Sequence, residues 1–214
     1  MSGIMPVRLA MDNPEINNRT AGDRDADPRQ KVIAAAWRVI CRDGLTAASL
    51  RTIAAEMGAT TGLVTRYYPE KHALMLAALE QAAALLCDNI TNGAANSTGM
   101  ARIEATVHAA LPVTPERLSA WRVWLAFIGE LPSAQELGVA HAAFPARLRQ
   151  ILVQGLREAQ RDGRISSKAY PPQLADMLVN QIIGLGMRGV IDPLRYPAEK
   201  LPALIAPLFS RLLD

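Results

Sequence analysis

Apolar residues recur along this chain at the spacing of amphipathic helices, and the pattern begins abruptly at residue 28. The first predicted helix carries a stripe at positions i, i+3, i+4, i+7 and i+8, formed by Ile33, Ala36, Trp37, Ile40 and Cys41. Asp27 suits its N-cap and Pro28 its first turn, whereas Gly44 ends it. The residues before it have no sustained periodicity, which predicts a disordered or weakly ordered arm over 1–27.

Two short helices separated by a glycine turn are predicted next. Ser49 is a favourable N-cap for the first of them. Gly58 then allows a tight connection, and the second short helix begins with Thr60 or Thr61 as its cap. A longer helix follows over residues 69–91, and because it is apolar on two sides we expect it to lie between two units.

The rest of the chain also has helical spacing and no convincing strand alternation, so the predicted fold class is all-α. A helix opens at Thr114, where proline follows. Ser133 with Glu136 has the signature of a capping box for a long helix that ends at Gly163. A further helix is predicted over 171–192, and a last one at the C-terminus.

The two short helices have the spacing of a helix-turn-helix, whose second helix enters the DNA major groove. In the second helix Leu63, Val64 and Tyr67 are expected to pack inward, and the residues expected to project outward are Thr60, Thr61, Thr65 and Arg66. No acidic residue between Glu56 and Glu70 would repel phosphate. The alternative is a helical hairpin whose exposed face is merely polar.

The outward residues predict specific contacts with DNA. Arg66 can donate twice to a guanine edge, and the threonines suit phosphates or thymine methyl groups. Gly62 lets the backbone come close, and Tyr67, Tyr68 and Lys71 suit phosphates. The candidate DNA-binding residues are Ser49, Thr60, Thr61, Gly62, Thr65, Arg66, Tyr67, Tyr68 and Lys71.

The motif SLRTIAAEMGATTG at 49–62, followed by Tyr67, Tyr68, Lys71 and Leu74, resembles the signature of the TetR family of bacterial transcriptional regulators. The resemblance covers residues 28–75. The family usually has an aromatic residue where Thr65 stands, so one phosphate contact is expected to be weaker or replaced. More faintly, WLAF at 124–127 and IGL at 183–185 are similar to the choline-responsive repressors of betaine synthesis.

This resemblance implies a homodimer that binds double-stranded DNA at a pseudo-palindromic operator and answers to a small-molecule effector. It implies a three-helix DNA-binding domain over 28–75 and a larger helical domain for effector binding and dimerisation over 76–214. Dimerisation would use the last two helices. The residues assigned to the dimer interface are Ile182, Leu185, Gly186, Gly189, Leu204 and Leu208.

Aromatic residues in the C-terminal half form a second candidate site. Trp121, Trp124 and Phe127 share one helical face, and His141, Phe144 and Met177 are expected to converge on it. Such rings can line an effector pocket and hold a cation through their quadrupoles. The alternative is that they are simply core.

Charge is concentrated around the helix-turn-helix motif. Residues 28–75 hold seven Lys or Arg against three acids, a net charge of +4, whereas residues 1–27 have a net charge of −2. A basic excess of this size fits a polyanionic partner, although solvated surfaces also show it. We expect a cytoplasmic protein without a membrane partner, because a long apolar run and a secretory signal are both lacking, and Cys41 and Cys87 suit a reducing compartment.

We expect neither a cofactor nor a metal site. The sequence GLGMRG at 184–189 matches a dinucleotide-binding pattern, but no strand precedes it, so its glycines are expected to serve close helix packing. The three histidines lack metal-ligand spacing, and no catalytic constellation is present in the sequence. A ligand-responsive DNA-binding repressor is therefore the main prediction, and a helical protein-binding adaptor or a helical enzyme are the alternatives.

Overall fold

The computed structural model describes residues 27–205 and 207, so most of the predicted arm over 1–27 lies outside the described residues. Every regular element of the described part is helical, which confirms the all-α prediction. The helices are α1 (Pro28–Asp43), α2 (Leu50–Glu56), α3 (Thr61–Tyr67), α4 (Lys71–Ala94), α5 (Gly99–Ala110), α6 (Pro115–Ala126), η3 (Ile128–Ser133), α7 (Gln135–Arg161), α8 (Pro171–Ile191) and η4 (Ala198–Lys200).

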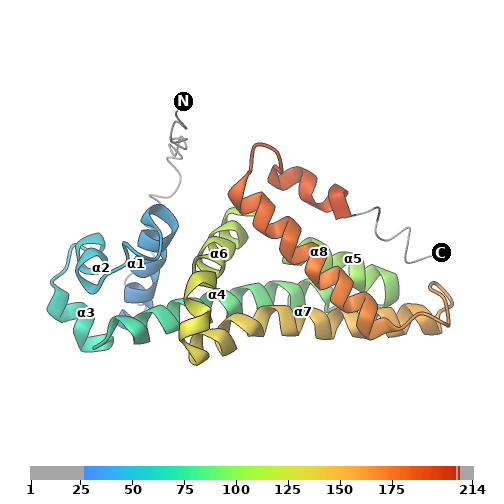
Figure 1. The fold of residues 1–214 in the computed structure, drawn as a ribbon, viewed down its shortest axis with the longest axis horizontal. Helices are drawn as coiled ribbons and strands as arrows, with labels where there is room; N and C mark the ends of the chain where they lie inside the picture. The colour runs from blue at the N-terminus through green and yellow to red at the C-terminus, as the bar shows by residue number, and fades with distance from the viewer. Residues whose placement is uncertain (1–26, 206, 208–214) are drawn as a thin grey trace.

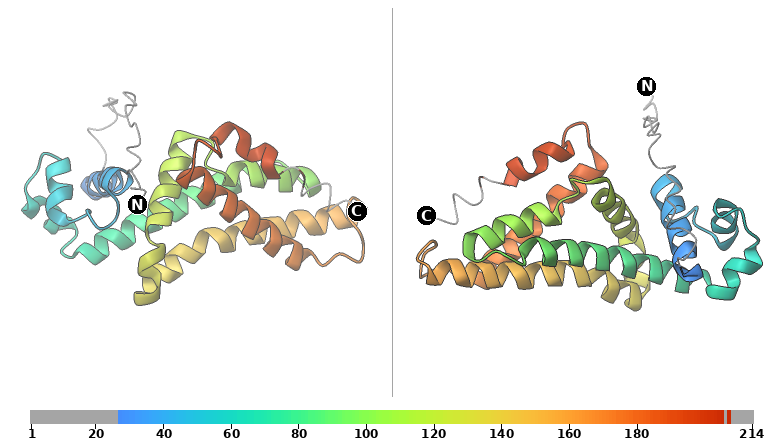
Figure 2. Two further views of the ribbon diagram at one scale, coloured as in Figure 1. Left: turned by 45° about the horizontal axis from the view of Figure 1, so that its top comes forward. Right: turned by 180° about the vertical axis from the view of Figure 1, so that it is seen from behind.

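The molecule is elongated, and its two ends differ (Figure 1). Helices α1, α2 and α3 project at one end of α4, and the loop that joins α7 to α8 lies at the opposite end. The long helices α4 and α7 run side by side, α8 crosses α7, and α6 stands across them, as both views in Figure 2 also show. The small N-terminal bundle is therefore presented to solvent, away from α8.

Local sequence explains most of the helix ends. Asp27 caps α1 by accepting a hydrogen bond from the Arg29 backbone N–H at 3.0 Å, and Gly44 ends the helix with a φ of +83°. Thr114 caps α6 by accepting from the Arg117 N–H at 3.3 Å. Gly163, with a φ of +67°, follows the end of α7 as predicted.

The predicted capping box at the start of α7 is wrong. Ser133 is the last residue of η3, a tight segment that contains Pro132, and the N-cap of α7 is Ala134. Because α7 starts one residue later than predicted, Glu136 is not in a capping position. Its carboxylate lies instead 3.4 Å from Nε2 of His72, in the first turn of α4.

Helix α4 lies between the two ends of the molecule, as predicted from its two apolar sides. It packs against α1 as well as against α5, α6 and α7, and Trp37 of α1 donates a hydrogen bond to the Ala78 carbonyl at 3.2 Å. Helices α4 and α8 are long and apolar enough to cross a membrane by length and composition alone. Both pack against other helices of the chain, and α8 keeps one side exposed.

Candidate nucleic-acid interface and effector site

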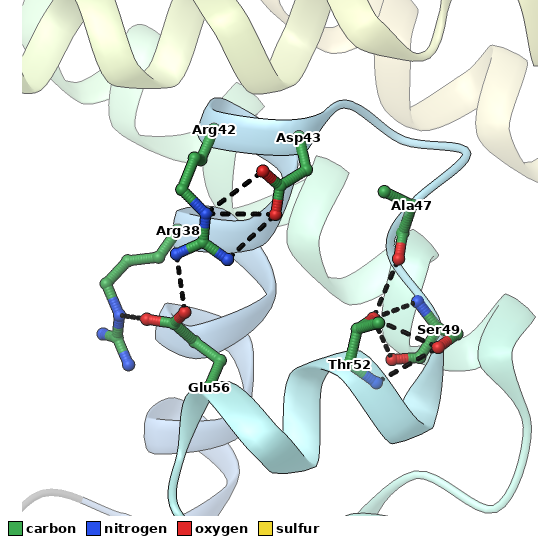
Figure 3. Close-up of polar contacts among 7 residues, drawn as sticks. All are labelled: Arg38, Arg42, Asp43, Ala47, Ser49, Thr52 and Glu56. Atoms are coloured by element: carbon green, nitrogen blue, oxygen red, sulfur yellow. Dashed lines mark hydrogen bonds and ion pairs between the residues drawn. The ribbon is translucent and has the colours of Figure 1, made fainter. Parts of the chain in front are cut away.

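A capping box fixes the start of α2. The Ser49 hydroxyl accepts from the Thr52 N–H at 3.1 Å, and Thr52 Oγ1 accepts from the Ser49 N–H at 2.8 Å (Figure 3). The Thr52 hydroxyl also lies 2.8 Å from the Ala47 carbonyl, to which it donates. Ser49, a predicted DNA-binding residue, therefore uses its hydroxyl to build the motif.

The turn between α2 and α3 begins at a glycine that follows the end of α2. Gly58 has a φ of +63°, and its N–H donates to the Ala55 carbonyl at 3.0 Å. The Ala59 N–H donates to the Ala54 carbonyl at 2.9 Å, which completes a Schellman motif. This turn directs the chain into α3, whose N-cap is Thr60.

An ion-pair cluster fastens α2 to α1 and was not predicted. Glu56 Oε1 lies 2.7 Å from Arg38 Nε, and Glu56 Oε2 lies 2.8 Å from Arg42 Nη1 (Figure 3). Hydrogen bonds from Arg42 and then Arg38 lower the pKa of this carboxyl. The negative charge of Glu56 is thus balanced by two arginines. The sequence signal was the pair of arginines four residues apart on α1, facing the lone acid of α2.

The outer face of α3 is exposed and carries free polar groups. Thr60, Thr61, Gly62 and Arg66 are exposed, and among the described residues the Thr60 and Thr61 hydroxyls have no hydrogen-bond partner. Arg66 has no carboxylate partner there either, and its guanidinium carbon lies 6.0 Å from the centroid of the Tyr67 ring. Arginine and two hydroxyls on one short helix can bind base edges and phosphates.

Three predicted roles on this helix need correction or refinement. Leu63 was expected inside, but 39 % of it is exposed, because Val64 next to it takes the inward position with 0 % exposed. Tyr68 is only 7 % exposed and lies under Arg29, so its ring is part of the core and unsuited to gripping phosphate. Thr65 is half-buried, and its hydroxyl donates to the Gly62 carbonyl at 3.2 Å.

Two further exposed cations lie on the helices that precede and follow α3. Lys71, at the start of α4, is exposed, and Tyr67 is half-buried against the core. Arg51, in the first turn of α2, is exposed and has no carboxylate partner within the described residues, yet sequence reasoning did not select it. Together these groups give the end of the molecule near α3 a surplus of unpaired positive charge.

The predicted effector residues of α6 and α7 form a closed aromatic cluster. The Trp121 ring centroid lies 5.5 Å from that of Trp124 and 5.6 Å from that of Phe144, in edge-to-face contacts. His141 stacks on Trp124 at 3.9 Å, and its backbone carbonyl accepts the Trp124 indole N–H at 3.0 Å. Phe127 is also fully buried. The rings of Trp121, Trp124, Phe127 and Phe144 thus belong to the packed interior, whereas His141 is half-buried.

Burial gives His141 a particular character. Desolvation lowers its pKa below the ordinary 6.5, so the imidazole is neutral at neutral pH. Its Nε2 atom is buried, and within the described residues it has no hydrogen-bond partner. A buried polar atom without a partner is costly unless something else supplies one.

Met177 does not belong to this cluster. It was predicted to converge on the aromatic residues, but 58 % of it is exposed, because it lies on the outward face of α8. A surface groove of 450 Å³ lies elsewhere, along the outer face of α7 between Ala146 and Arg161, and includes none of the predicted effector residues.

Three of the six residues assigned to the dimer interface pack within the chain instead. Ile182 is 0 % exposed, a Cβ at Gly186 would collide with the Trp121 ring, and a Cβ at Gly189 would lie 2.8 Å from Leu201. These three assignments are wrong, since this face of α8 covers the chain's own core. Leu185 is half-buried and Leu204 is 50 % exposed, whereas Leu208 lies outside the described residues.

Comparison with protein families agrees with this geometry. Residues 32–78 match the model described as bacterial regulatory proteins of the tetR family. Residues 99–214, more than half of the chain, match the model of the BetI-type transcriptional repressor C-terminal domain. The chain belongs to the TetR family. It is therefore a DNA-binding transcriptional regulator, and the helix-turn-helix of α2 and α3 is its DNA-binding element.

Named TetR-family relatives cover most of the chain. The regulator PksA of Bacillus subtilis is 23 % identical over 184 residues, which are 85 % of this chain and 88 % of that protein. The regulator BetI of Vibrio campbellii is 25 % identical over 181 residues, which are 83 % of this chain and 87 % of that protein.

Solved structures share the fold. A transcriptional regulator from Saccharomonospora viridis in complex with choline superposes with a TM-score of 0.77 at 22 % identity, over 85 % of this chain and 95 % of that one. A regulator from Rhodococcus sp. Rha1 gives a TM-score of 0.74 at 20 % identity, over 88 % and 96 % of the two chains.

Proposed function

We propose that this regulator is a homodimeric repressor that binds a pseudo-palindromic operator and leaves it when a small molecule binds the C-terminal domain. Residues 28–75 would form the DNA-binding domain, and residues 76–214 the effector-binding and dimerisation domain. The protein acts in the cytoplasm and performs no catalysis. The single observation that carries the proposal is the outer face of α3, whose exposed polar side chains have no hydrogen-bond or ion-pair partner within the described residues and include no acid. The nearby carboxylate of Glu56 is paired with Arg38 and Arg42.

Roles on DNA follow from the exposed groups. Arg66 reads a guanine, because its guanidinium can donate to both O6 and N7. The hydroxyls of Thr60 and Thr61 bind phosphates at the start of α3. Lys71, Tyr67 and Arg51 hold the flanking backbone and set the register of the protein on the duplex.

The outward face of α8 supports dimerisation. Met177, Met187 and Ile191 are 58 %, 38 % and 70 % exposed and lie on one side of the helix, and Leu194 beyond it is 92 % exposed. Leu204 of the following segment adds a further exposed leucine. Several exposed apolar residues on one side of a helix are typical of association surfaces, and two-fold pairing on this face would produce an inverted-repeat operator.

The aromatic cluster is suited to a small organic cation. Stacked and edge-on rings offer negative faces, and a neutral His141 does not repel positive charge. The unpartnered Nε2 of His141 can hydrogen-bond a polar group of the same ligand. Because the Saccharomonospora viridis regulator was solved with choline, choline is the first effector to test. The rings must separate to admit it.

A direct contact connects this cluster with the DNA-binding end. Helix α6, which carries Trp121 and Trp124, also carries Ser119, whose hydroxyl lies 3.5 Å from the Cys41 sulfur of α1. Separation of the rings would displace α6 and with it α1. In a dimer that displacement changes the distance between the two recognition helices, which weakens operator binding.

Selection of bound sequences from randomised duplex DNA tests the proposal. We expect one inverted repeat to be enriched, with binding that weakens steeply as salt rises. Addition of choline or a related quaternary ammonium compound should release the selected duplex. Recovery of no enriched sequence together with salt-insensitive binding would favour a protein-binding adaptor instead. Retention of the operator at saturating choline would contradict that effector and leave the dimeric operator binding intact.

A further inference from the structure

Leu63 is the only large apolar side chain exposed on α3, and it lies among polar groups. Thr60 and Thr61 precede it, Gly62 adjoins it, and Arg66 lies one turn further on. A single exposed leucine is common on protein surfaces and by itself needs no explanation. The position of this one, on the helix that enters the major groove, makes its chemistry relevant to recognition.

The surroundings of Leu63 leave it open to a partner. A Cβ built at Gly62 would meet only Thr60 Oγ1, at 3.8 Å, so no bulky group crowds this part of the helix surface. The Thr65 hydroxyl donates to the Gly62 carbonyl at 3.2 Å and is therefore engaged within α3. The centre of the recognition helix thus presents an alkyl group, with hydrogen-bonding groups at Thr60 and Arg66 on either side.

The groups that each base presents in the major groove indicate which base can contact that alkyl group. In the major groove, guanine presents acceptors, cytosine a donor, and adenine one of each. Thymine alone adds an apolar feature, its C5-methyl group. A leucine side chain can neither donate nor accept a hydrogen bond. Against any other base edge it would desolvate a polar atom without replacing its hydrogen bond.

We propose that Leu63 is a specificity-determining residue that reads one thymine in each half of the operator through the C5-methyl group of that base. The proposal rests on the operator binding proposed above. Leu63 and Arg66 are three residues apart, a rise of about 4.5 Å along the helix, and successive base pairs are about 3.4 Å apart. The thymine therefore lies within about one or two base pairs of the guanine that Arg66 reads.

Replacement of thymine by uracil tests the contact, because it removes only the methyl group. Each thymine of the selected operator is replaced symmetrically in both half-sites, and the dissociation constant is measured by fluorescence anisotropy. For the unmodified protein we expect one position at which affinity falls roughly fourfold per half-site, the value for burial of one methyl-sized group. Other positions should change by less than about twofold.

The Leu63→Ala variant supplies the second arm. It should bind the thymine and uracil operators with nearly equal affinity, because the alkyl group that distinguishes them has been removed. Lys71→Ala is the matched control: it should weaken both duplexes by the same factor and keep their ratio. Since Leu63 and Lys71 are both exposed, circular dichroism melting should show that both variants remain folded.

The outcomes separate the two proposals. A uracil effect of equal size in the unmodified protein and in Leu63→Ala would overturn the role of Leu63, as would the absence of any sensitive thymine. Both results would leave operator binding intact. Failure of the unmodified protein to select any duplex would instead overturn the proposed function, and the role of Leu63 with it.

Discussion

The outer face of α3 and the aromatic cluster of α6 and α7 are both candidate binding sites, but their states in the folded chain are opposite. On α3 the side chains of Thr61, Leu63 and Arg66 are exposed and contribute little to the core. In the cluster, Trp121 and Phe144 are fully buried and packed against each other. The outer face of α3 needs no rearrangement before it can bind DNA. The effector site, by contrast, can open only if the packing contacts among its own rings are broken.

This difference makes the cluster the larger contributor to stability. Trp121→Ala should lower the free energy of unfolding by roughly 3–5 kcal/mol, since it removes a fully buried ring that contacts two others. Urea denaturation monitored by circular dichroism measures the loss. Val139→Ala, an exposed position on α7, is the control and should change stability by less than about 0.5 kcal/mol. Equal losses in the two variants would contradict the closed cluster.

The reverse pattern is expected on α3. Arg66→Ala should leave unfolding unchanged, because Arg66 is exposed and has no ion pair within the described residues. It should cost about 1–3 kcal/mol of operator affinity and relax preference at one base pair of each half-site. Lys71→Ala should weaken specific and random duplexes alike. Equal loss of specific and random binding by both variants, measured by anisotropy, would remove the base-reading role of Arg66.

Sequence analysis was most successful where short-range chemistry decides the structure. The N-cap residues Asp27, Ser49 and Thr114 and the turn at Gly58 each form hydrogen bonds or φ angles that local sequence dictates. These features were enough to predict the helix-turn-helix. The aromatic residues, by contrast, contact one another across different helices. The sequence therefore could not decide whether they form part of the core or line an effector pocket.

Helix α8 shows why the dimer interface could not be predicted. Its polar residues Gln173, Asp176, Asn180, Gln181 and Arg188 all lie on the exposed side, but Met177, Met187 and Ile191 share that side. An apolar residue of α8 can therefore belong either to the face that covers the chain's own core or to the exposed face. Ile182 and Gly186 were assigned to the partner but pack against the chain itself. Leu63 was misplaced for a similar reason, since on a seven-residue helix two adjacent apolar residues give no clear periodicity.

The ion pairs of Glu56 provide the smallest expected effect and link stability to pH. Glu56→Gln should destabilise the protein by about 1 kcal/mol at pH 7, a modest value because Arg38 and Arg42 are 46 % and 56 % exposed and are screened by solvent. Hydrogen bonds from Arg42 and Arg38 lower the pKa of Glu56 from its ordinary 4.5. Its stabilising contribution is therefore present above pH 4.5 and is lost as the pH falls through the lowered value.

The difference in unfolding free energy between the unmodified protein and Glu56→Gln should consequently shrink as the pH falls below 4.5. Chemical denaturation between pH 7 and about pH 3 measures it. Other carboxyls titrate in the same range, so Glu104→Gln, an exposed position on α5, serves as the control and should differ little from the unmodified protein at any pH. A difference for Glu56→Gln that persists unchanged in acid would show that Glu56 fastens α2 to α1 through shape or neutral hydrogen bonds. In that case the contact between α1 and α2 would not depend on the charge of Glu56.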